Sequence, residues 1–357
     1  MSTIVLSAGG TGGHLFPAQA LAAELSRRGR KIVVMTDTRF ANYAIHFPAA
    51  MIETVPSSPF NAVSAPFKIV AGILCAFVKL VRLRPAAVIG FGGYPSVPVM
   101  LAAWIARRPT AILEQNAVVG RANRLVMNKV KLMAAAFPIA RFAPRDKSKI
   151  VLTGNPLRPE VTALWGSPYS LPRDDGAIRI LVFGGSQGAR AFSKIVPAAI
   201  TRLPHGLKHR LQLMQQCRPE DIESVREVYA NAEIRAELAP FFHDLPARMA
   251  AAHLVIGRSG AGTVAELMAI GRPAILVPLP YALDDNQTPN ADLLADAGAG
   301  WRLRESDLSP DLLSQMLVGI LGDPHDLERR AAQAHALAVP DAAGKLADLV
   351  ERLAGAA

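Results

Sequence analysis

Two glycine-rich turns carry the residue types best suited to chemistry in this sequence. The first reads Gly9-Gly-Thr-Gly-Gly-His14, and the second reads Gly184-Gly-Ser-Gln-Gly188. In each case a strand pattern enters the turn and a helical pattern leaves it. The first N–H groups of such a helix lack partners, and the helix dipole adds positive potential. Both turns therefore predict a site for an anionic group such as a phosphate.

Two titratable side chains stand beside turns of this kind. His14 lies at the start of a helix, where it is either a plain helix-start residue or a general base facing a substrate. Glu266 follows a third such turn, built on Gly257, Gly260 and Gly262. Its carboxylate could accept both hydroxyls of a ribose, or could simply be an acidic residue favoured by the helix dipole. The residues alone leave these alternatives open.

Other nucleotide-binding classes fit poorly. Neither glycine turn matches G-x-G-x-x-G, and Asp37, at the end of the second predicted strand, is weak support for a nicotinamide enzyme. No Gly-Lys-(Ser/Thr) element follows a glycine turn, which excludes a P-loop NTPase. We interpret Asp284-Asp285 as part of a solvated loop rather than a metal-binding pair. We therefore expect neither a metal nor a cofactor.

Composition limits the remaining choices. The chain has 357 residues, 51% of them hydrophobic and 19% charged, which predicts a globular protein of two domains. The net charge of +10 indicates an anionic partner. With only Cys75 and Cys217, a disulfide framework is not expected, and a reducing compartment is. The N-terminus reads as a first strand rather than a signal peptide, and no apolar run is long enough to span a membrane.

Short strands alternate with helices in both halves of the chain, which predicts parallel sheets with right-handed crossovers. We predict an α/β protein of two doubly wound, Rossmann-like domains with ligands at the carboxyl ends of the strands. The domains are expected at 1–158 and 178–340, joined by a linker at 159–177 that is rich in Pro, Gly, Ser and Asp. A C-terminal helix within 341–357 is expected to pack back on the first domain. After the first apolar run at Ile4, the further strands are predicted at 31–35, 50–55, 87–90, 110–113, 150–153, 178–183, 210–214, 253–257 and 274–277.

These blocks together resemble the MurG glycosyltransferase family, which has the two-domain GT-B fold. The matching elements follow the family's order over nearly the whole chain: Gly9–His14, Gly90–Ser96, Glu114–Asn116, Gly154–Arg158, Gly184–Ala189, Arg258–Glu266 and the polar cluster Asp284–Asn290. The resemblance implies an inverting transfer of N-acetylglucosamine (GlcNAc) from UDP-GlcNAc to the C4 hydroxyl of MurNAc in undecaprenyl-pyrophosphoryl-MurNAc-pentapeptide (lipid I). The product is lipid II, the precursor of peptidoglycan.

The resemblance also implies roles for single residues. His14 is the expected base and Glu114 the second choice, because Leu113 stands where the family usually has a histidine before Glu-Gln-Asn. Ser186, with Arg158 nearby, would hold the UDP phosphate. Phe242 would face uracil through its backbone, and Glu266 would bind the ribose diol. The other residues implied for UDP-GlcNAc are Thr11, Gly12, Gly13, Asn116, Ala261, Gly262, Thr263, Val264, Ala265, Asn286 and Gln287, and the acceptor candidates are Gly92, Gly93 and Tyr94.

The stretch 66–84 is apolar, bordered by basic residues and too short to span a membrane. It is either a core helix or a helix that lies in the membrane interface. Each basic residue near an anionic leaflet contributes about 1 kcal/mol, and lipid I resides in such a leaflet. We therefore expect peripheral docking at the cytoplasmic face of the bacterial inner membrane. The candidate membrane-facing residues are Phe67, Lys68, Ile73, Phe77, Lys79, Arg82 and Arg84.

The expected partners are thus UDP-GlcNAc, lipid I, an anionic membrane surface and other cell-wall synthesis proteins. Nucleic acid is not expected, because the sequence has neither an RNA-binding motif nor an aromatic stripe. The alternatives are a UDP-GlcNAc 2-epimerase, a GT-B transferase with another acceptor, and an inert membrane-associated scaffold. The turn at 9–14 and the element Gly90–Tyr94 argue against the epimerase. His14 together with the full donor-site set argues against the scaffold.

Overall fold

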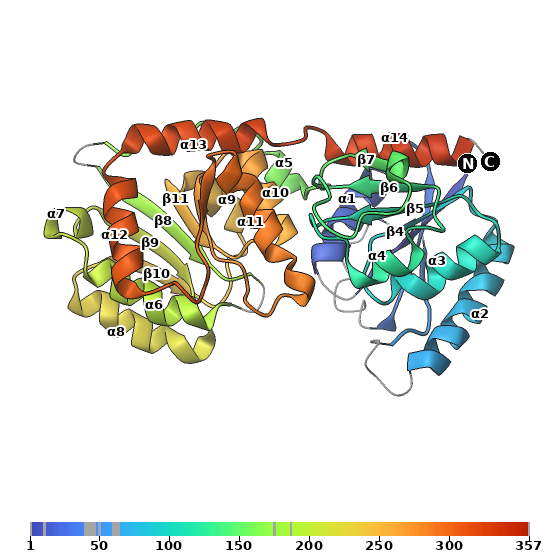
Figure 1. Ribbon diagram of the computed structural model, residues 1–357, viewed down its shortest axis with the longest axis horizontal. Coiled ribbons are helices and arrows are strands. Elements are labelled where there is room, and N and C mark those ends of the chain that lie inside the picture. Colours follow the sequence, from blue (N-terminus) through green and yellow to red (C-terminus); the bar gives the residue numbers. More distant parts are fainter. Residues whose placement is uncertain are drawn as a thin grey trace. The chain divides into compact units, whose positions relative to one another are not determined.

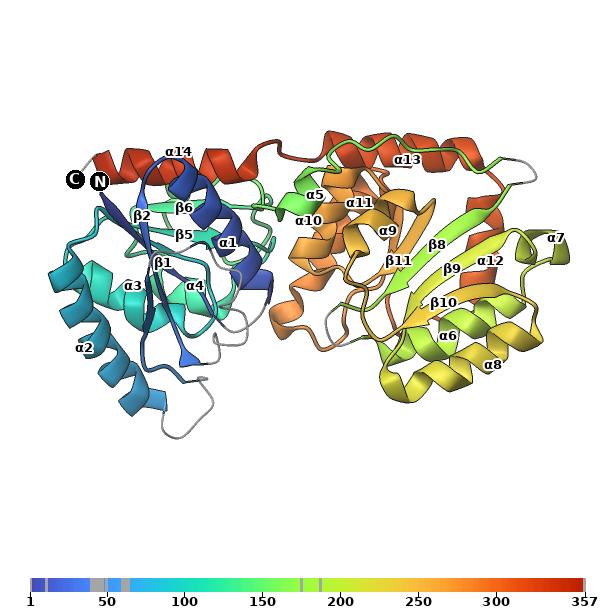
Figure 2. The same ribbon diagram turned by 180° about the vertical axis from the view of Figure 1, so that it is seen from behind.

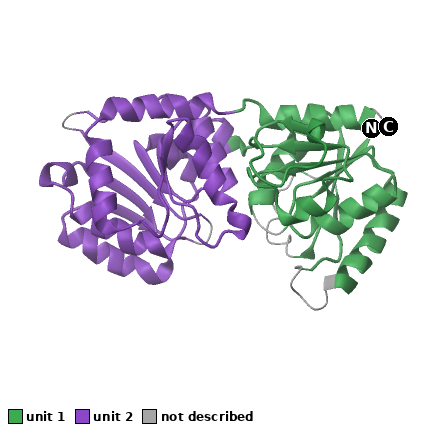
Figure 3. Cartoon of the chain, in the orientation of Figure 1, with its two compact units in different colours: residues 1–159, 339–357 green, residues 160–338 purple. Residues whose placement is uncertain are grey.

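The computed structural model describes residues 2–9, 12–38, 48, 51–58, 65–173, 176–185 and 188–355 (Figure 1). The chain divides into two compact units (Figure 3). Unit 1 comprises residues 1–159 and 339–357, and unit 2 comprises residues 160–338. Each unit is built on a parallel sheet with helices on both faces, so the predicted class of two doubly wound α/β domains is confirmed.

The described part of unit 1 holds a seven-stranded sheet of order β3-β2-β1-β4-β5-β6-β7, in which every pairing is parallel. The order reverses direction between β1 and β4. In a doubly wound sheet this switch point is where ligands bind, at the carboxyl ends of the strands. The strands are β1 (Thr3–Ser7), β2 (Lys31–Thr36), β3 (Met51–Thr54), β4 (Ala87–Gly90), β5 (Thr110–Glu114), β6 (Leu132–Ala135) and β7 (Ile150–Leu152).

Alternate residues of these strands face two separate hydrophobic layers. Ile4 and Leu6 of β1 join the layer that contains α1 and α14, whereas Val5 joins the layer that contains α2, α3 and α4 (Figures 1 and 2). Side chains on both faces are fully buried, which explains why the strands read as continuous apolar runs. The helices are α1 (Gly12–Arg27), α2 (Ala65–Leu83), α3 (Ser96–Ile105), α4 (Arg121–Val126) and α14 (Ala342–Gly355).

The last helix, α14, packs along α1 in unit 1. Leu346, Leu349 and Val350 bury its apolar face in the core. The polar side of α14 forms ion pairs with Arg28, which directly follows α1. Arg28 Nη1 lies 2.5 Å from Asp348 Oδ1 and 2.9 Å from Glu351 Oε2. These carboxylates, with Glu24, raise the pKa of Arg28. The C-terminal residues 339–357 therefore belong to the core of unit 1, although they follow unit 2 in the sequence.

The described part of unit 2 holds a six-stranded parallel sheet of order β10-β9-β8-β11-β12-β13, with its switch point between β8 and β11. The strands are β8 (Ile178–Phe183), β9 (Leu211–Gln216), β10 (Arg235–Ala239), β11 (Leu254–Gly257), β12 (Ala274–Leu276) and β13 (Gly300–Arg302). The helices are α5 (Pro159–Thr162), α6 (Arg190–Thr201), α7 (His205–Lys208), α8 (Ile222–Asn231), α9 (Leu245–Ala251), α10 (Ala261–Ile270), α11 (Gln287–Asp296), α12 (Pro310–Leu321) and α13 (Pro324–Ala336).

The segment after α5 is packed on unit 2 through a fully buried arginine. Arg272, 2% exposed, donates hydrogen bonds to the carbonyls of Ser167 and Pro168, both at 3.0 Å. It also donates to the carbonyls of Ala250, Ile270 and Gly271. A buried guanidinium needs such partners to offset its loss of hydration. The described part of the segment read as a linker is thus held in place by the domain that follows it.

Three strands were missed by the sequence prediction. β6 has the sequence Leu-Met-Ala-Ala, whose residues favour helices, and β13 has only three residues. β10 follows α8 with the helix-like pattern Arg-Ala-Glu-Leu-Ala. In each case pairing with a neighbouring strand overrides a weak local preference.

Candidate active site

His14 lies in the first turn of α1, and its imidazole packs against the loop that follows β4. A Cβ added to Gly92 would come within 3.3 Å of His14 Cε1, and one added to Gly93 within 3.4 Å of Cδ2. Both glycines have φ in the left-handed region, at 82° and 73°. Only glycine adopts this conformation readily and leaves room for the ring. The His14 imidazole therefore packs directly on Gly92 and Gly93 of the Gly-Phe-Gly-Gly element, and we call these two glycines its seat.

This seat lies at the switch point of the unit 1 sheet. The N–H of Phe91, just after β4, donates to the carbonyl of Ser7 at the end of β1, at 2.8 Å. A Cβ on Gly9 would meet the Pro95 side chain at 2.9 Å, so the loops after β1 and β4 are in close contact. The predicted residues His14, Gly92 and Gly93 therefore meet where a doubly wound sheet binds its ligand.

Glu114 ends the neighbouring strand β5, and its buried carboxylate holds the loop that leads to α4. Oε1 accepts from the N–H of Asn116 at 3.0 Å. Oε2 accepts from the N–H of Gly120 at 2.9 Å and from Asn123 Nδ2 at 2.8 Å. Both oxygens are thus engaged by the loop and by the first turn of α4.

The pKa of His14 is lowered by burial of the imidazole. The Glu114 carboxylate, the Gln115 side chain and the backbone of Phe91 oppose this shift. Gln115 is itself fixed, because its Nε2 donates to the Phe91 carbonyl at 2.9 Å. A pKa below 6.5 leaves the imidazole neutral at pH 7, the state that a general base requires.

The other predicted residues of unit 1 surround this seat. Gly12 begins α1, with Gly13 and then His14 after it, whereas Thr11 lies outside the described residues. Tyr94 is half-buried in the loop after β4. The Arg158 guanidinium lies over the Phe16 ring of α1, with Cζ 4.8 Å from the ring centroid. Arg158 thus belongs to the His14 side of the protein, in unit 1.

In unit 2, a glycine turn joins β8 to α6. Gly185 and Gly188 have φ of 84° and 68°, and a Cβ on Gly184 would lie 2.2 Å from the nitrogen of Ala189. The turn is therefore closed tightly on itself and requires glycine at these positions. Ser186, the residue expected to hold phosphate, lies outside the described residues.

The second turn of unit 2 joins β11 to α10, on the other side of the switch point. Ala261, Val264 and Ala265 are buried on the inner face of α10. Gly262, Thr263 and Glu266 are half-buried, and Glu266 follows the other two by four and three residues, so its side chain lies on the same outer face as both. Of the six residues predicted to bind the nucleotide, three therefore pack α10 against the core of unit 2. The other three remain accessible to a ligand through their side chains or backbone.

The polar cluster Asp284–Asn290 is tied to this same turn. Asn290 Nδ2 donates to the Ser259 carbonyl at 3.1 Å, and Ser259 Oγ donates to the Gln287 carbonyl at 2.8 Å. Gln287 Oε1 accepts from the N–H of Leu279 at 3.0 Å, which leaves its NH2 group directed elsewhere. Asn286 is half-buried directly before α11. Asp284 and Asp285 have φ of 56° and 50°, an uncommon conformation that is concentrated at functional sites.

The Phe242 side chain packs inward. It is 6% exposed, and the Arg248 guanidinium lies 4.4 Å from its ring centroid. Only the backbone of Phe242 therefore remains for a ligand. Phe241, directly before it, is 53% exposed.

Two residues that hold the unit 2 loops are given no role by the sequence analysis, although Arg258 begins one of its matching elements. Gln216 Oε1 accepts from the N–H of Gly184 at 3.1 Å, and Gln216 Nε2 donates to the Pro240 carbonyl at 3.0 Å. The buried Arg258 donates to the carbonyls of Val277 and Pro278 and pairs with Glu305. The available signal for Gln216 was a Gln-Gln pair that ends a strand, an unusual polar finish for a buried element.

The membrane-facing candidates of α2 differ in how far each is exposed in the structure, and Ile73, Phe77 and Lys79 are only partly exposed. Ile73 and Phe77 pack against the core, and Lys79 forms an ion pair with Glu53 on β3. The other four candidates, Phe67, Lys68, Arg82 and Arg84, are exposed, and their contact with a membrane stays a prediction. The exposed apolar face of α2, at helical spacing, consists instead of Phe67, Val70, Leu74, Val78 and Val81. We call these five residues the α2 stripe.

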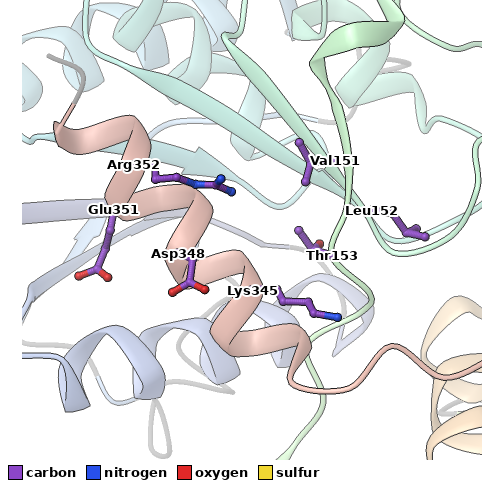
Figure 4. Close-up of a pocket in the computed structure, with 7 residues that line it drawn as sticks. All are labelled: Val151, Leu152, Thr153, Lys345, Asp348, Glu351 and Arg352. Atoms are coloured by element: carbon purple, nitrogen blue, oxygen red, sulfur yellow. The ribbon is translucent and has the colours of Figure 1, made fainter.

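A separate groove of about 580 Å³ lies between β7 and α14 in unit 1 (Figure 4). Its lining consists of Val151, Leu152, Thr153, Lys345, Asp348, Glu351 and Arg352, none of which is a predicted site residue. Every helix that the structure describes is too short or too polar to span a lipid bilayer. The described residues contain no group of three or more His, Cys, Asp and Glu that could hold a metal ion.

Comparison with known proteins places these features in a family. The glycosyltransferase family 28 N-terminal domain matches residues 4–135, and the corresponding C-terminal domain matches residues 179–346. The chain is 47% identical to a protein of Phenylobacterium zucineum (strain HLK1), over 99% of this chain and 98% of that one. That relative is named UDP-N-acetylglucosamine--N-acetylmuramyl-(pentapeptide) pyrophosphoryl-undecaprenol N-acetylglucosamine transferase. A protein of the same name from Rhodopseudomonas palustris (strain ATCC BAA-98 / CGA009) is 49% identical, with 98% of each chain covered.

Solved structures agree. The crystal structure of Acinetobacter baumannii MurG matches with a TM-score of 0.83 and 31% identity, over 99% of this chain and 100% of that one. A UDP-GlcNAc 2-epimerase from Neisseria meningitidis matches with a TM-score of 0.70, over 99% of this chain and 100% of that one. At 11% identity that match shows a shared fold alone.

Two doubly wound units, each with glycine turns at its switch point, and both family 28 domains define a glycosyltransferase of the GT-B fold. Its relatives share nearly half of its residues over almost the whole chain. The chain belongs to the MurG family.

Proposed function

We propose that this chain transfers GlcNAc from UDP-GlcNAc to the C4 hydroxyl of MurNAc in lipid I and so makes lipid II. Its relatives carry the name of this reaction. The observation in this chain that supports the proposal most directly is the position of the His14 imidazole, which packs on Gly92 and Gly93 at the switch point of unit 1. An inert scaffold would not need a titratable side chain held in this way.

Unit 2 binds the donor in this proposal. The turn at 184–188, with Ser186, holds the diphosphate through backbone N–H groups. Glu266, on the outer face of α10, accepts the ribose hydroxyls, and the first N–H groups of that helix face the nucleotide. Phe242 meets uracil through its backbone, since its ring is packed inward. Asn286 and the NH2 group of Gln287 bind the hydroxyls of GlcNAc.

Unit 1 binds the acceptor. The loop of Gly92, Gly93 and Tyr94 lines the place where the C4 hydroxyl is presented to His14. Thr11, Gly12, Gly13 and Asn116 bind sugar groups beside it, and Arg158 adds positive charge for the diphosphate. Donor and acceptor are therefore held by different units, and the reaction requires their alignment.

The proposed chemistry is a single displacement with inversion at the anomeric carbon. The C4 oxygen attacks C1 of GlcNAc, its proton passes to His14, and the bond from C1 to the diphosphate oxygen breaks to release UDP. A well-placed base contributes about 10²–10⁴-fold to the rate. Glu114 acts as a positioning residue, because its oxygens are engaged in the loop and its charge favours the imidazolium.

Docking on the cytoplasmic face of the inner membrane uses the α2 stripe in this proposal. Phe67 is 81% exposed and Leu74 62% exposed, which is unusual for large apolar side chains. The adjacent helix α3 adds Trp104, with the ammonium of Lys129 4.7 Å from its ring centroid. An apolar stripe with basic neighbours fits an anionic leaflet, where each cation contributes about 1 kcal/mol.

The reaction is tested by UDP release from UDP-GlcNAc by the purified chain, with and without a lipid I analogue. We expect release only with acceptor, together with one new disaccharide-lipid. Conversion of UDP-GlcNAc without acceptor to UDP-ManNAc, or with water to ManNAc and UDP, would indicate the epimerase instead. UDP-GlcNAc and lipid I both unchanged would leave an inert scaffold.

Membrane docking is tested by sedimentation with vesicles of neutral lipid and of neutral lipid with anionic phosphatidylglycerol. We expect binding that requires the anionic lipid and weakens with salt. The double variant Phe67→Ser/Leu74→Ser should lose most of this binding. Val318→Ser on α12, which also removes an exposed apolar side chain, should bind as wild type. Equal binding by both variants would contradict the role of the stripe.

A further inference from the structure

The end of β9 touches both loops that the donor nucleotide would use. β9 lies between β8 and β10 in the unit 2 sheet, so its carboxyl end is flanked by the loops that follow those two strands. One is the glycine turn that begins at Gly184. The other begins at Pro240 and contains Phe242. Gln216, the last residue of β9 and 5% exposed, reaches both.

The two contacts use both ends of one amide. Gln216 Oε1 accepts from the N–H of Gly184 at 3.1 Å, and Gln216 Nε2 donates to the Pro240 carbonyl at 3.0 Å. Proline has no N–H, so its carbonyl is the only backbone group by which this residue can be held. Directly after Gln216, the N–H of Cys217 donates to the Ala239 carbonyl at 3.0 Å and so continues the pairing of β9 with β10.

A glycine-rich turn is ordered more easily when a neighbouring residue holds it by hydrogen bonds. Gly185 and Gly188 adopt φ values open to glycine, and glycine loses more conformational freedom on ordering than any other residue. At the other end of the turn, the Arg218 side chain lies beside Gly188, with Cγ 3.2 Å from the position of an added Cβ. The end of β9 therefore holds the turn by a hydrogen bond at Gly184, its first glycine. A loop ordered before binding costs less to bind.

We propose that Gln216 is a positioning residue of the donor site, which holds the phosphate turn and the uracil loop in their binding conformations through one amide. The inference rests on the proposed function, in which these two loops bind UDP. It assigns to Gln216 an effect on donor affinity rather than on the chemical step.

The adjacent residue provides a matched control. Gln215 is also fully buried on β9, but as a neighbour in a strand it points to the opposite face. There its Oε1 accepts from the Tyr229 hydroxyl at 2.5 Å and its Nε2 donates to the Phe192 carbonyl at 3.3 Å. Loss of either amide removes two buried hydrogen bonds, but only Gln216 contacts the donor loops.

The experiment compares Gln216→Met and Gln215→Met by calorimetric UDP binding and by steady-state kinetics. For Gln216→Met we expect the Kd of UDP and the KM of UDP-GlcNAc to rise about tenfold, which equals 1.4 kcal/mol and lies within the range for one or two neutral hydrogen bonds. The kcat and the KM of the lipid I analogue should stay within about threefold. Gln215→Met should lower thermal stability to a similar extent and leave the Kd of UDP unchanged.

The proposal fails if the Kd of UDP is unchanged in Gln216→Met or rises equally in both variants, since an equal rise would reflect general loss of stability. If Gln216→Met does not fold, Gln216→Asn replaces it, because an amide shorter by one methylene cannot span both partners and predicts the same rise. UDP binding is measured without acceptor. The test of Gln216 therefore stands even if the wild-type chain fails to glycosylate lipid I.

Discussion

The imidazole of His14 rests on the Cα of Gly92, where an added Cβ would lie 3.3 Å from Cε1 and 3.4 Å from Nδ1 of the ring. The contact joins the first turn of α1 to the loop after β4. Two adjacent residues of that loop, Gly92 and Gly93, face the ring and both have left-handed backbone conformations, so glycine is favoured there by space and by φ alike. The position of the proposed base is thus set by the absence of side chains in a distant segment.

We expect Gly92→Ala to lower kcat by about tenfold to a hundredfold, because the new methyl would press on the imidazole and displace the base. The left-handed backbone would also cost about 1–2 kcal/mol of stability. Gly29→Ala separates the two effects. Gly29 has φ 76°, in the same unit, but nothing lies within 4 Å of its Cβ position. This control should lose similar stability and keep wild-type kcat, and an equal fall of kcat in both variants would contradict the contact as the cause.

The activity should depend on pH through His14. Burial lowers the pKa of His14 from 6.5, so the acidic limb of kcat/KM, which reports the free enzyme, should lie below pH 6.5. The Glu114 charge opposes that shift. Glu114→Gln should therefore move the limb to still lower pH and reduce kcat at pH 7 by about tenfold or more. Asp146→Asn, on the surface of unit 1, should leave the limb unchanged. A shift of the limb to higher pH in Glu114→Gln would refute the proposed coupling.

The sequence predicted the doubly wound class and the glycine turns because both depend on local patterns. Strands buried on both faces read as apolar runs, and a turn with positive φ requires glycine. The pairing of Gly92 with His14 could not be predicted in this way. It follows from the order of β1 and β4 in the sheet, and residue types alone do not show which ring a glycine faces.

The face of α2 shows a second limit. Helical spacing in this segment fits two apolar faces: the predicted one, with Ile69, Ile73, Phe77 and Leu80 beside Phe67, and the α2 stripe. Packing of α2 on α3 distinguishes the two faces, since it leaves Ile73 and Phe77 partly buried against the core. A helix that is apolar all round gives no periodic signal for its exposed side.

Unit 2 should lose stability in mild acid through His253. This residue is 3% exposed, and its Nδ1 accepts from the backbone N–H of Arg179 at 2.9 Å. Burial, together with Arg179 and Arg272, lowers the pKa of His253 to about 4. The imidazole is neutral in the fold, whereas the unfolded chain binds a proton below pH 6.5. Stability should therefore fall by about 3 kcal/mol as the pH drops from 6.5 to 4.

Urea denaturation in a Trp104→Phe background measures this effect, since Trp165 and Trp301 then report on unit 2 alone. His253→Asn keeps a hydrogen-bond acceptor for Arg179 but cannot titrate. Its stability should stay nearly constant over the same pH range, apart from changes common to the wild type at other groups. Parallel pH profiles for the two chains would show that His253 is not the cause.

Position 113 tests whether the base has been assigned to the right side chain. Leu113 stands where the family usually has a histidine, and in this structure it is fully buried in the layer formed with α1 and α14. A histidine there would leave the core without leucine and bury a polar ring, at a cost of about 3 kcal/mol. We therefore expect Leu113→His to lower stability without raising kcat. Leu349→His, in the same layer on α14, should behave alike. If kcat rose more than threefold in Leu113→His alone, a side chain at 113 could reach the reacting atoms, and His14 would not be the sole base available to this fold.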